Sequence, residues 1–214
     1  MQSAVGVVRE REVPASWIAL KRLIDVVLGS LLLLLAFPLV ALAALAIAII
    51  TGGVPFYAQE RVGMHGRRFK MLKLRTMVPG AHAMREHLDH LNECDGPVFK
   101  MRDDPRCHPL GRMLRRASID ELPNLVNVVR GEMSLVGPRP ALPSEVERYD
   151  DFAYRRLCVP QGVTGLWQIG GRTTLPFARW IDLDNRYIDE WTPLGDLVII
   201  LKTIPAVLRK DGAR

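Results

Sequence analysis

The stretch Arg112–Gly131, RMLRRASIDELPNLVNVVRG, combines an acidic pair, several arginines and an apolar helical repeat. Apolar residues recur in its second half at i, i+3, i+4 and i+7, the spacing of one face of an α-helix. They are Leu122, Leu125, Val126 and Val129. Gly131 follows the last of them, where a glycine typically ends a helix. The stretch therefore predicts a short amphipathic helix with Asp120 and Glu121 near its start.

Two starting points fit this helix. Ser118 and Glu121 have the spacing of a capping box, which would place both acids in the first turn. Counted from Ser118, however, Pro123 would be well inside the helix, where its missing N–H removes a hydrogen bond. Counted from Asp120 it falls in the first turn, where that N–H has no helical partner in any case. We therefore expect Asp120 to lie at or near the N-cap.

The acidic pair has two interpretations, one structural and one chemical. Carboxylates favour helix N-termini whatever the function of a protein, and nearby arginines would pair with them. A helix N-terminus flanked by guanidinium groups also attracts phosphate, and here Arg112, Arg115 and Arg116 precede the pair. An ionised carboxylate in such a place can attack phosphorus once cations screen the repulsion between the anions. The stretch alone leaves both interpretations open.

The composition of the chain limits its class and its partners. Its 214 residues suit one domain with an attached segment. The 29 basic and 23 acidic residues give a net charge of +6, which favours anionic partners. The three cysteines, Cys94, Cys107 and Cys158, are odd in number and share no metal-ligand spacing. They fit a reducing compartment better than a disulfide framework.

An uncharged apolar run, Val26–Ile50, dominates the N-terminal part of the chain. As a straight helix it would be roughly 38 Å long, which exceeds the thickness of the hydrocarbon core of a bilayer. Three membrane roles fit it: a cleaved signal peptide with its small-residue site at Ala41-Leu42-Ala43, a spanning helix, or a re-entrant hairpin that enters and leaves by one face.

Two features favour the hairpin. Pro38 lies near the middle of the run, where it bends or breaks a helix. Basic residues flank the run on both sides, and because such residues prefer the cytoplasmic side, their placement conflicts with a single crossing. They are Lys21 and Arg22 before the run, and Arg61, Arg67, Arg68, Lys70, Lys73 and Arg75 after it. The run also continues past the signal-peptide site to Ile50, which argues against cleavage.

Two short strands are predicted next, at 54–59 and 68–76, on either side of a turn at Gly63–Gly66. Lys73 and Arg75 lie on the second strand. A helix is predicted over 81–93, in a region that contains His82, His87, His90 and Cys94. A metal site built from these four side chains is an alternative to an ordinary exposed helix, although their spacing matches no common zinc pattern.

Two later loops could bind an anion. Ser134–Pro140 reads SLVGPRP, and its two prolines fix the backbone on either side of Arg139. An arginine held rigidly suits phosphate binding, although an exposed arginine in a stiff loop would show the same pattern. A glycine-rich passage over 160–172 includes Arg172, and such passages let backbone N–H groups approach an anion. It lacks the P-loop pattern.

Three more helices are predicted in the C-terminal part, at 144–157, 176–191 and 194–208. Ser144 and Glu147 have capping-box spacing at the start of the first. We expect the aromatic residues of the second to lie in the core. The third carries an apolar stripe of Leu194, Leu197, Val198, Leu201 and Leu208. That stripe fits either an anionic membrane surface or ordinary core packing.

Taken together and in this order, the motifs resemble those of the bacterial sugar transferases, the monotopic phosphoglycosyl transferases that prime exopolysaccharide and glycan assembly. The resemblance covers residues 20–213. Its motifs are Lys21–Asp25, Gln59–Gly63, Lys73–Met77, Asp104–Arg106, Ser118–Pro123, Met133–Pro140, Thr164–Gln168 and Gly171–Arg172. Many members of the family have Ser-Pro at the break of the membrane helix, where this chain has Phe37-Pro38.

The resemblance implies transfer of a phosphosugar from a UDP-sugar to polyprenyl phosphate, with release of UMP. Because both reactants are anionic, we expect Mg²⁺ as a cofactor that offsets their repulsion. Asp120 matches the nucleophile of the family and Glu121 its acidic neighbour, and these two would supply the carboxylates for Mg²⁺. The matching basic positions, which would bind substrate, are Lys73, Arg75, Arg115, Arg139 and Arg172. Glu121 could instead act as a base, and the sequence does not separate the two roles.

The expected architecture is an α-rich α+β fold, a compact cytoplasmic domain on a re-entrant membrane helix. We divide the chain into a tail (1–20), the membrane helix (21–53) and a catalytic domain with amphipathic interfacial helices (54–214). The resemblance implies the bacterial inner membrane, with the catalytic domain on its cytoplasmic face. The sequence identifies neither the sugar nor the oligomeric state.

The alternative is a non-enzymatic, membrane-anchored basic module that binds anionic lipid or nucleic acid. The acids among the arginines argue against it, because a surface that binds polyanions would be better without them. We therefore expect no nucleic-acid partner.

Overall fold

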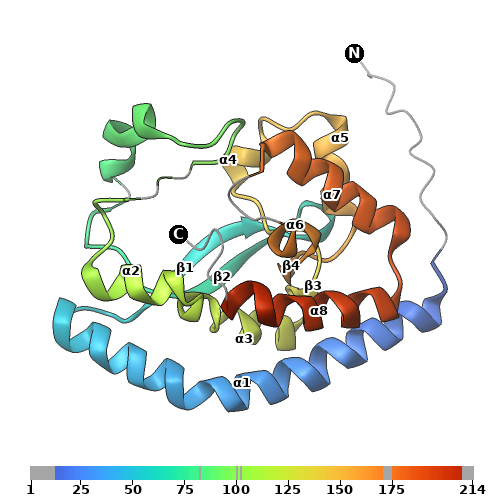
Figure 1. The fold of residues 1–214 in the computed structure, drawn as a ribbon, viewed down its shortest axis with the longest axis horizontal. Coiled ribbons are helices and arrows are strands. Elements are labelled where there is room, and N and C mark those ends of the chain that lie inside the picture. The colour runs from blue at the N-terminus through green and yellow to red at the C-terminus, as the bar shows by residue number, and fades with distance from the viewer. Residues whose placement is uncertain (1–12, 82, 100, 102, 171–174, 209–214) are drawn as a thin grey trace.

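The computed structural model describes residues 13–81, 83–99, 101, 103–170 and 175–208. One long helix, α1 (Ala15–Thr51), runs along one side of a body made of short helices and two small sheets (Figure 1). The helix-rich α+β class is thus confirmed. The helix begins at Ala15, inside the segment assigned to the tail, and Pro38 lies within its continuous length.

The two sheets each contain two strands. β1 (Phe56–Val62) and β2 (Arg68–Leu74) form an antiparallel hairpin around the short 3₁₀ helix η1 (Met64–Gly66), which confirms the predicted strand–turn–strand unit with shifted ends. β3 (Ser134–Val136) and β4 (Gly162–Thr164) pair in parallel. Gly66 adopts a positive φ of 77°, a conformation that glycine reaches at little steric cost.

The remaining elements are helices, most of them short. In chain order they are η2 (Ala83–Leu91), α2 (Pro109–Arg116), η3 (Ile119–Glu121), α3 (Asn124–Arg130), α4 (Pro143–Val146), α5 (Asp151–Tyr154), η4 (Arg155–Cys158), α6 (Leu166–Ile169), α7 (Phe177–Glu190) and α8 (Pro193–Leu208). The segment predicted as a helix over 81–93 is therefore a 3₁₀ helix over a shorter range.

The prediction that Asp120 caps the helix is wrong. α3 begins at Asn124 with Pro123 at its N-cap, and Asp120 belongs to the preceding 3₁₀ turn η3. Ser118 has a φ of 56°, in the left-handed region, so the chain reverses there and the acids lie in a turn of their own. The end of the helix is confirmed, because Gly131 has a φ of 84° and caps α3.

The continuous helix predicted over 144–157 is also wrong, because that segment forms α4, α5 and η4. Glu145 accepts a hydrogen bond from the backbone N–H of Leu142 (2.9 Å), so α4 starts before the predicted cap. Asp150 then accepts one from the N–H of Ala153 (2.8 Å) and starts a new helix. Two local caps thus divide the segment.

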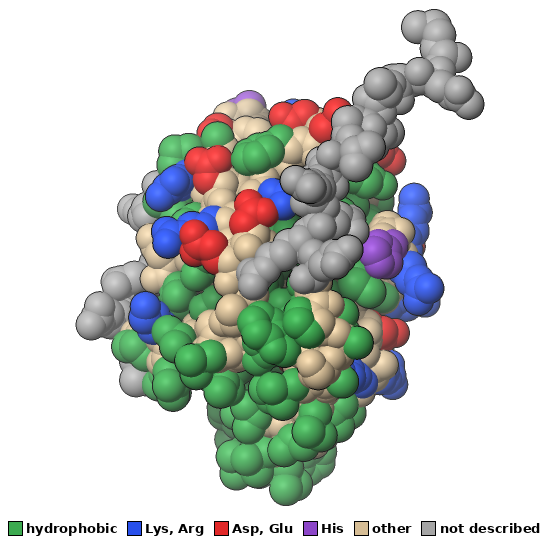
Figure 2. All heavy atoms as spheres, turned by 90° about the vertical axis from the view of Figure 1, so that its right-hand side faces the viewer, with side chains coloured by type: hydrophobic (Ala, Val, Ile, Leu, Met, Phe, Trp, Pro, Cys, Tyr) green, Lys and Arg blue, Asp and Glu red, His purple; other side chains and the backbone are tan. Residues whose placement is uncertain are grey.

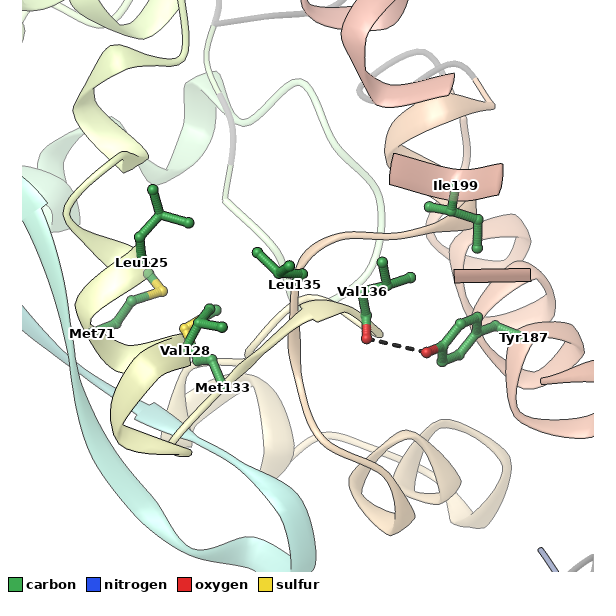
Figure 3. Close-up of a cluster of buried hydrophobic side chains, with 8 residues drawn as sticks. All are labelled: Met71, Leu125, Val128, Met133, Leu135, Val136, Tyr187 and Ile199. Carbon is green, nitrogen blue, oxygen red and sulfur yellow. Dashed lines mark hydrogen bonds between the residues drawn. The ribbon is translucent and has the colours of Figure 1, made fainter. Parts of the chain in front are cut away.

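The main core joins both halves of the chain. It consists of Met71, Leu125, Val128, Met133, Leu135, Val136, Tyr187 and Ile199 (Figure 3). The hydroxyl of Tyr187 donates to the carbonyl of Val136 (3.1 Å), so α7 is fixed to β3 at this core. Trp180 and Ile181 of α7 are buried, as predicted for the aromatic face of that helix.

α1 packs on the body along both of its halves. Gly29 lies against Val128 of α3, and the C-terminal half contributes Ala43, Ala44 and Ile47 to a second buried cluster with Leu74 and Leu114. Near its start, the Nζ of Lys21 donates to Asp196 of α8 (2.6 Å) and to the carbonyl of Val136 (3.0 Å). The helix is therefore part of the packed structure of the body.

The outer face of α1 is apolar and exposed. Within the described residues, α1 is long and apolar enough to cross a membrane by length and composition. Its convex side faces away from the body, and hydrophobic side chains gather at the end of the molecule where it lies (Figures 1 and 2). The predicted stripe of α8 also faces outward at Leu194, Leu197, Val198 and Leu201, whereas Ile199 is buried.

Candidate active site

The acidic pair lies in a turn that is fixed from two sides. Ile119, which precedes Asp120, packs on the cluster formed by the C-terminal half of α1 and by α2. On the other side, Asn127 of α3 is fully buried and bonds to β2: its amide donates to the carbonyl of Lys70 (2.9 Å) and its oxygen accepts from the N–H of Leu72 (3.1 Å). Asn127 thus fixes η3 and α3 against the strand that carries Lys73.

Lys73 reaches the acidic pair directly. Its Nζ lies 2.6 Å from Oε1 of Glu121, and both side chains are partly buried. Asp120 is more deeply buried, with 7% of its surface exposed. The predicted residues Lys73, Asp120 and Glu121 are therefore brought together, although Lys73 and Glu121 are 48 positions apart in the sequence.

The two neighbouring acids have opposite electrostatic environments. The pKa of Asp120 is raised to about 6, chiefly by burial and also by the charge of Glu121, while Lys73 and Arg115 partly oppose the rise. Lys73 lowers the pKa of Glu121 to about 2, with help from Arg139 and Arg61. Glu121 is thus a stable anion at neutral pH, and Asp120 is the more basic of the two carboxylates.

The predicted basic residues do not all lie in one place. Arg115 donates from Nε to Thr76 Oγ1 (2.9 Å), and its charge lowers the pKa of Asp120. The charge of Arg139 lowers the pKa of Glu121, and its Nη1 lies 3.8 Å from Oε2 of Glu145. The guanidinium of Arg75 lies against Gly53 at the end of α1, where a Cβ on the glycine would be 3.1 Å from Nη1. Arg172 lies outside the described residues.

Comparison with known proteins identifies the family. Residues 16–210, most of the chain, match the family described as bacterial sugar transferase. The chain belongs to this family. The resemblance predicted from the motifs is therefore confirmed, and the alternative of a non-enzymatic module is set aside.

The chain is similar to relatives named for exopolysaccharide production or for sugar-phosphate transfer involving undecaprenyl phosphate. Exopolysaccharide production protein ExoY of Rhizobium meliloti is 42% identical over 197 residues, which cover 90% of this chain and 87% of the relative. The UDP-glucose:undecaprenyl-phosphate glucose-1-phosphate transferase of Caulobacter vibrioides is 43% identical, covering 90% and 71%. The undecaprenyl-phosphate galactose phosphotransferase of Salmonella typhimurium is 40% identical, covering 91% of this chain and 41% of that protein.

Two residues of the transferase that bear on the site were missed from the sequence. Arg61 of β1 is buried, and its charge lowers the pKa of Glu121. In the hairpin, Arg61 lies opposite Phe69 and Tyr57 lies opposite Lys73, so all four side chains share one face of the sheet. The predicted strand over 54–59 ends before Arg61, whereas β1 continues to Val62. Extending the strand alternation to Arg61 would have placed it on the same face as Lys73.

The second missed residue is His108, which joins the segment just after β2 to the helix before the acidic turn. Its Nδ1 accepts from the N–H of Gly111 in α2 (3.0 Å), so Nε2 carries the proton that faces the carbonyl of Arg75 (3.2 Å). Gly111 lies so close to the segment that follows β2 that a Cβ would be 2.1 Å from the carbonyl oxygen of Thr76. Only glycine fits this contact, which positions α2 and the turn that follows it.

Asp120 and Glu121 are the two carboxylates expected to hold Mg²⁺. Among the described residues, no group of three or more His, Cys, Asp or Glu side chains could hold a metal, so the alternative of a histidine metal site has no support there; His82 lies outside them. Mg²⁺ is usually held by one or two carboxylates together with phosphate oxygens of the substrate. Asp120 and Glu121 fit that donor set, because they are adjacent carboxylates and the charge of Glu121 disfavours the ionised form of Asp120, a repulsion that a cation would relieve.

Proposed function

We propose that this transferase moves a phosphosugar from a UDP-sugar to polyprenyl phosphate and releases UMP, through a covalent intermediate on Asp120. The observation that carries the proposal is the placement of a buried, unusually basic carboxylate beside a second acid and several cations. The activities for which the relatives in Caulobacter vibrioides and Salmonella typhimurium are named support the choice of polyprenyl acceptor.

The reaction has two displacements at the same phosphorus. In the first, a carboxylate oxygen of Asp120 attacks the β-phosphorus of the UDP-sugar. A bond forms between Asp120 and phosphorus, the bond from phosphorus to the bridging oxygen breaks, and UMP leaves with the electron pair. In the second, an oxygen of polyprenyl phosphate attacks the same phosphorus, the bond to Asp120 breaks, and the carboxylate is regenerated. The product is a polyprenyl diphosphate sugar.

The surroundings of Asp120 suit this role. A pKa of about 6 leaves the carboxylate mostly ionised at neutral pH while making it a better nucleophile than an ordinary aspartate. Lys73, Arg115 and Arg139 offset the repulsion between the carboxylate and the diphosphate. Because the pKa of Glu121 is low, Glu121 is a poor base, and we assign it to Mg²⁺ binding together with Asp120. When bound there, Mg²⁺ would offset the charge of the transferred phosphoryl group.

The membrane supplies the acceptor. We assign α1 to a re-entrant membrane helix, because its outer face is apolar and both of its ends turn toward the body (Figure 1). The exposed stripe of α8 then rests on the lipid surface, as Leu194 and Leu201 indicate. We further propose that the site lies at the cytoplasmic face of the bacterial inner membrane, where the phosphate of a membrane-embedded polyprenyl chain can reach Asp120.

The test is UMP release by the purified protein from UDP-sugars, with and without polyprenyl phosphate. Asp120→Asn should lose turnover and should form no adduct with radiolabelled UDP-sugar, because the amide is not a nucleophile for this step. Glu121→Gln should also lose turnover but can still trap adduct. The matched control is Asp151→Asn, an exposed acid in the first turn of α5, which should behave as the unsubstituted protein.

Mass spectrometry should locate the label on the peptide that contains Asp120 when the acceptor is withheld. Substantial turnover by Asp120→Asn, or an adduct on another peptide, would show that Asp120 has only a structural role in the turn.

A further inference from the structure

The loop that presents Arg139 is bonded at four successive carbonyl groups. Each carbonyl accepts from a different donor, and two of the donors are arginine side chains. The bonds run from Gly162 N to Pro138 O (2.8 Å), Arg156 Nη2 to Arg139 O (3.3 Å), Arg61 Nη1 to Pro140 O (3.0 Å) and Val62 N to Ala141 O (2.9 Å). A loop bonded at every residue has little freedom to turn, so the direction of the Arg139 side chain is set by these donors.

Arg156 is the donor to the carbonyl of Arg139 itself, and its own position is fixed. Its guanidinium is buried, forms an ion pair with Asp184 of α7 (2.7 Å) and donates to the hydroxyl of Tyr149 (2.6 Å). It also lies over the ring of Tyr149, 5.6 Å from the centroid. A buried charge is costly unless it is paired, and here the pairing holds Arg156 in one orientation.

The side chain of Arg139 has a charged neighbour of its own, Glu145. Glu145 is 2% exposed and lies 3.8 Å from Nη1 of Arg139, and its carboxylate is itself fixed by the N–H of Leu142. Arg139 is partly exposed, unlike Arg156. Of these two arginines, Arg139 is the one available to a ligand, and Arg156 supports its backbone.

We propose that Arg156 is a positioning residue that aims the guanidinium of Arg139 at the diphosphate of the nucleotide sugar without touching the substrate. The inference rests on the proposed function, in which Arg139 binds that diphosphate. The planar fork of an arginine binds phosphate only in a narrow range of geometries, and displacements of about 1 Å in a site can cost on the order of 10²-fold in rate.

A double-mutant cycle between Arg156 and Arg139 tests the proposal. Arg156→Lys retains a charge for Asp184, but its single nitrogen cannot serve Asp184, Tyr149 and the carbonyl of Arg139 together. We expect it to lower kcat/KM for the UDP-sugar by about 10- to 100-fold, mainly through KM, at nearly unchanged Tm. In an Arg139→Ala background the same substitution should lower kcat/KM by less than about twofold, because position 139 then has no guanidinium to be positioned.

Two further variants make the cycle decisive. Arg155→Lys is the matched control: the neighbouring arginine also pairs with an aspartate of α7, Asp189, but at the surface, and the change should leave kcat/KM unaltered. Asp184→Asn, which weakens the support of Arg156, should show a smaller loss that also disappears in the Arg139→Ala background. A loss of equal size in both backgrounds, or no loss in either, would overturn the proposal.

A binding measurement separates this inference from the proposed function. UDP affinity is measured by calorimetry for the same four proteins of the cycle. If the unsubstituted protein binds UDP but releases no UMP from any UDP-sugar, the proposed function fails, and the coupling between Arg156 and Arg139 is still read from the affinities. Additive losses of UDP affinity would refute the positioning role whatever the reaction is.

Discussion

Replacing Asp120 by Asn is expected to stabilise the folded protein at neutral pH while it removes turnover. Burial raises the pKa of Asp120 from 3.8 to about 6. One pKa unit corresponds to about 1.4 kcal/mol, so at pH 7 the ionised carboxylate lowers the free energy of unfolding by about 3 kcal/mol relative to a neutral side chain. Asn is neutral and has nearly the same shape, so it escapes this cost.

The effect must depend on pH with a definite sign. Because the folded pKa is the higher one, the folded protein binds more protons than the unfolded chain between about pH 3.8 and pH 6. Asp120 therefore lowers the free energy of unfolding progressively as the pH rises through this window. Above about pH 6 the size of this destabilisation no longer changes with pH. At pH 4.5 the advantage of the Asn variant should have shrunk to about 1 kcal/mol.

Thermal unfolding in detergent measures the difference. For a chain of this size about 1 kcal/mol shifts Tm by roughly 2–4 °C, so Asp120→Asn should melt about 6–12 °C higher at pH 7 and only a few degrees higher at pH 4.5. Glu121→Gln is the control and should lower Tm instead of raising it. Lys73 lowers the pKa of Glu121, and the substitution removes this attraction from the folded state. A lower Tm for Asp120→Asn than for the unsubstituted protein, or an equal increase in Tm at both pH values, would refute the account of Asp120 as a buried carboxylate with a raised pKa.

Two further predictions concern the metal and the membrane. Chelation with EDTA should abolish UMP release and added Mg²⁺ should restore it, because two carboxylates and a diphosphate need a shared cation; unchanged turnover after chelation would remove Mg²⁺ from the site. Single cysteines introduced as Ser3→Cys and Gly212→Cys should both be labelled only from the cytoplasmic side, and periplasmic labelling at position 3 alone would show a spanning helix instead of a re-entrant one.

A helix or strand of this fold could be predicted from the sequence where a short local pattern of residues is enough to define it. The hairpin of β1 and β2 follows from two strand patterns around Gly63–Gly66, and the end of α3 follows from Gly131. The position of Asp120 could not be predicted in this way. The left-handed Ser118 separates a 3₁₀ turn from α3, and a capping pattern read along the chain does not reveal such a reversal.

The assembly of the site depends on contacts between distant residues, which the sequence does not show. The acidic turn meets Lys73 because Asn127 bonds to β2, and Arg61 joins them because the hairpin register puts it on the same face. The apolar stripe of α8 shows a different limit. Leu194 and Leu201 fit core packing and a lipid surface equally well by composition, and only the fold shows that they face outward.

The ion pair between Lys21 and Asp196 has a practical consequence for anyone who wants a water-soluble form of this enzyme. Deleting α1 would leave the carboxylate of Asp196 buried without its ammonium partner, and breaking such a pair by removing one member typically costs about 3–5 kcal/mol. It would also uncover Leu74 and Leu114, on which Ala43 and Ile47 now pack. Since domains are stable by only about 5–15 kcal/mol in total, a truncated chain should not fold. Preparations of this protein must therefore keep the hydrophobic helix and supply detergent or lipid for it.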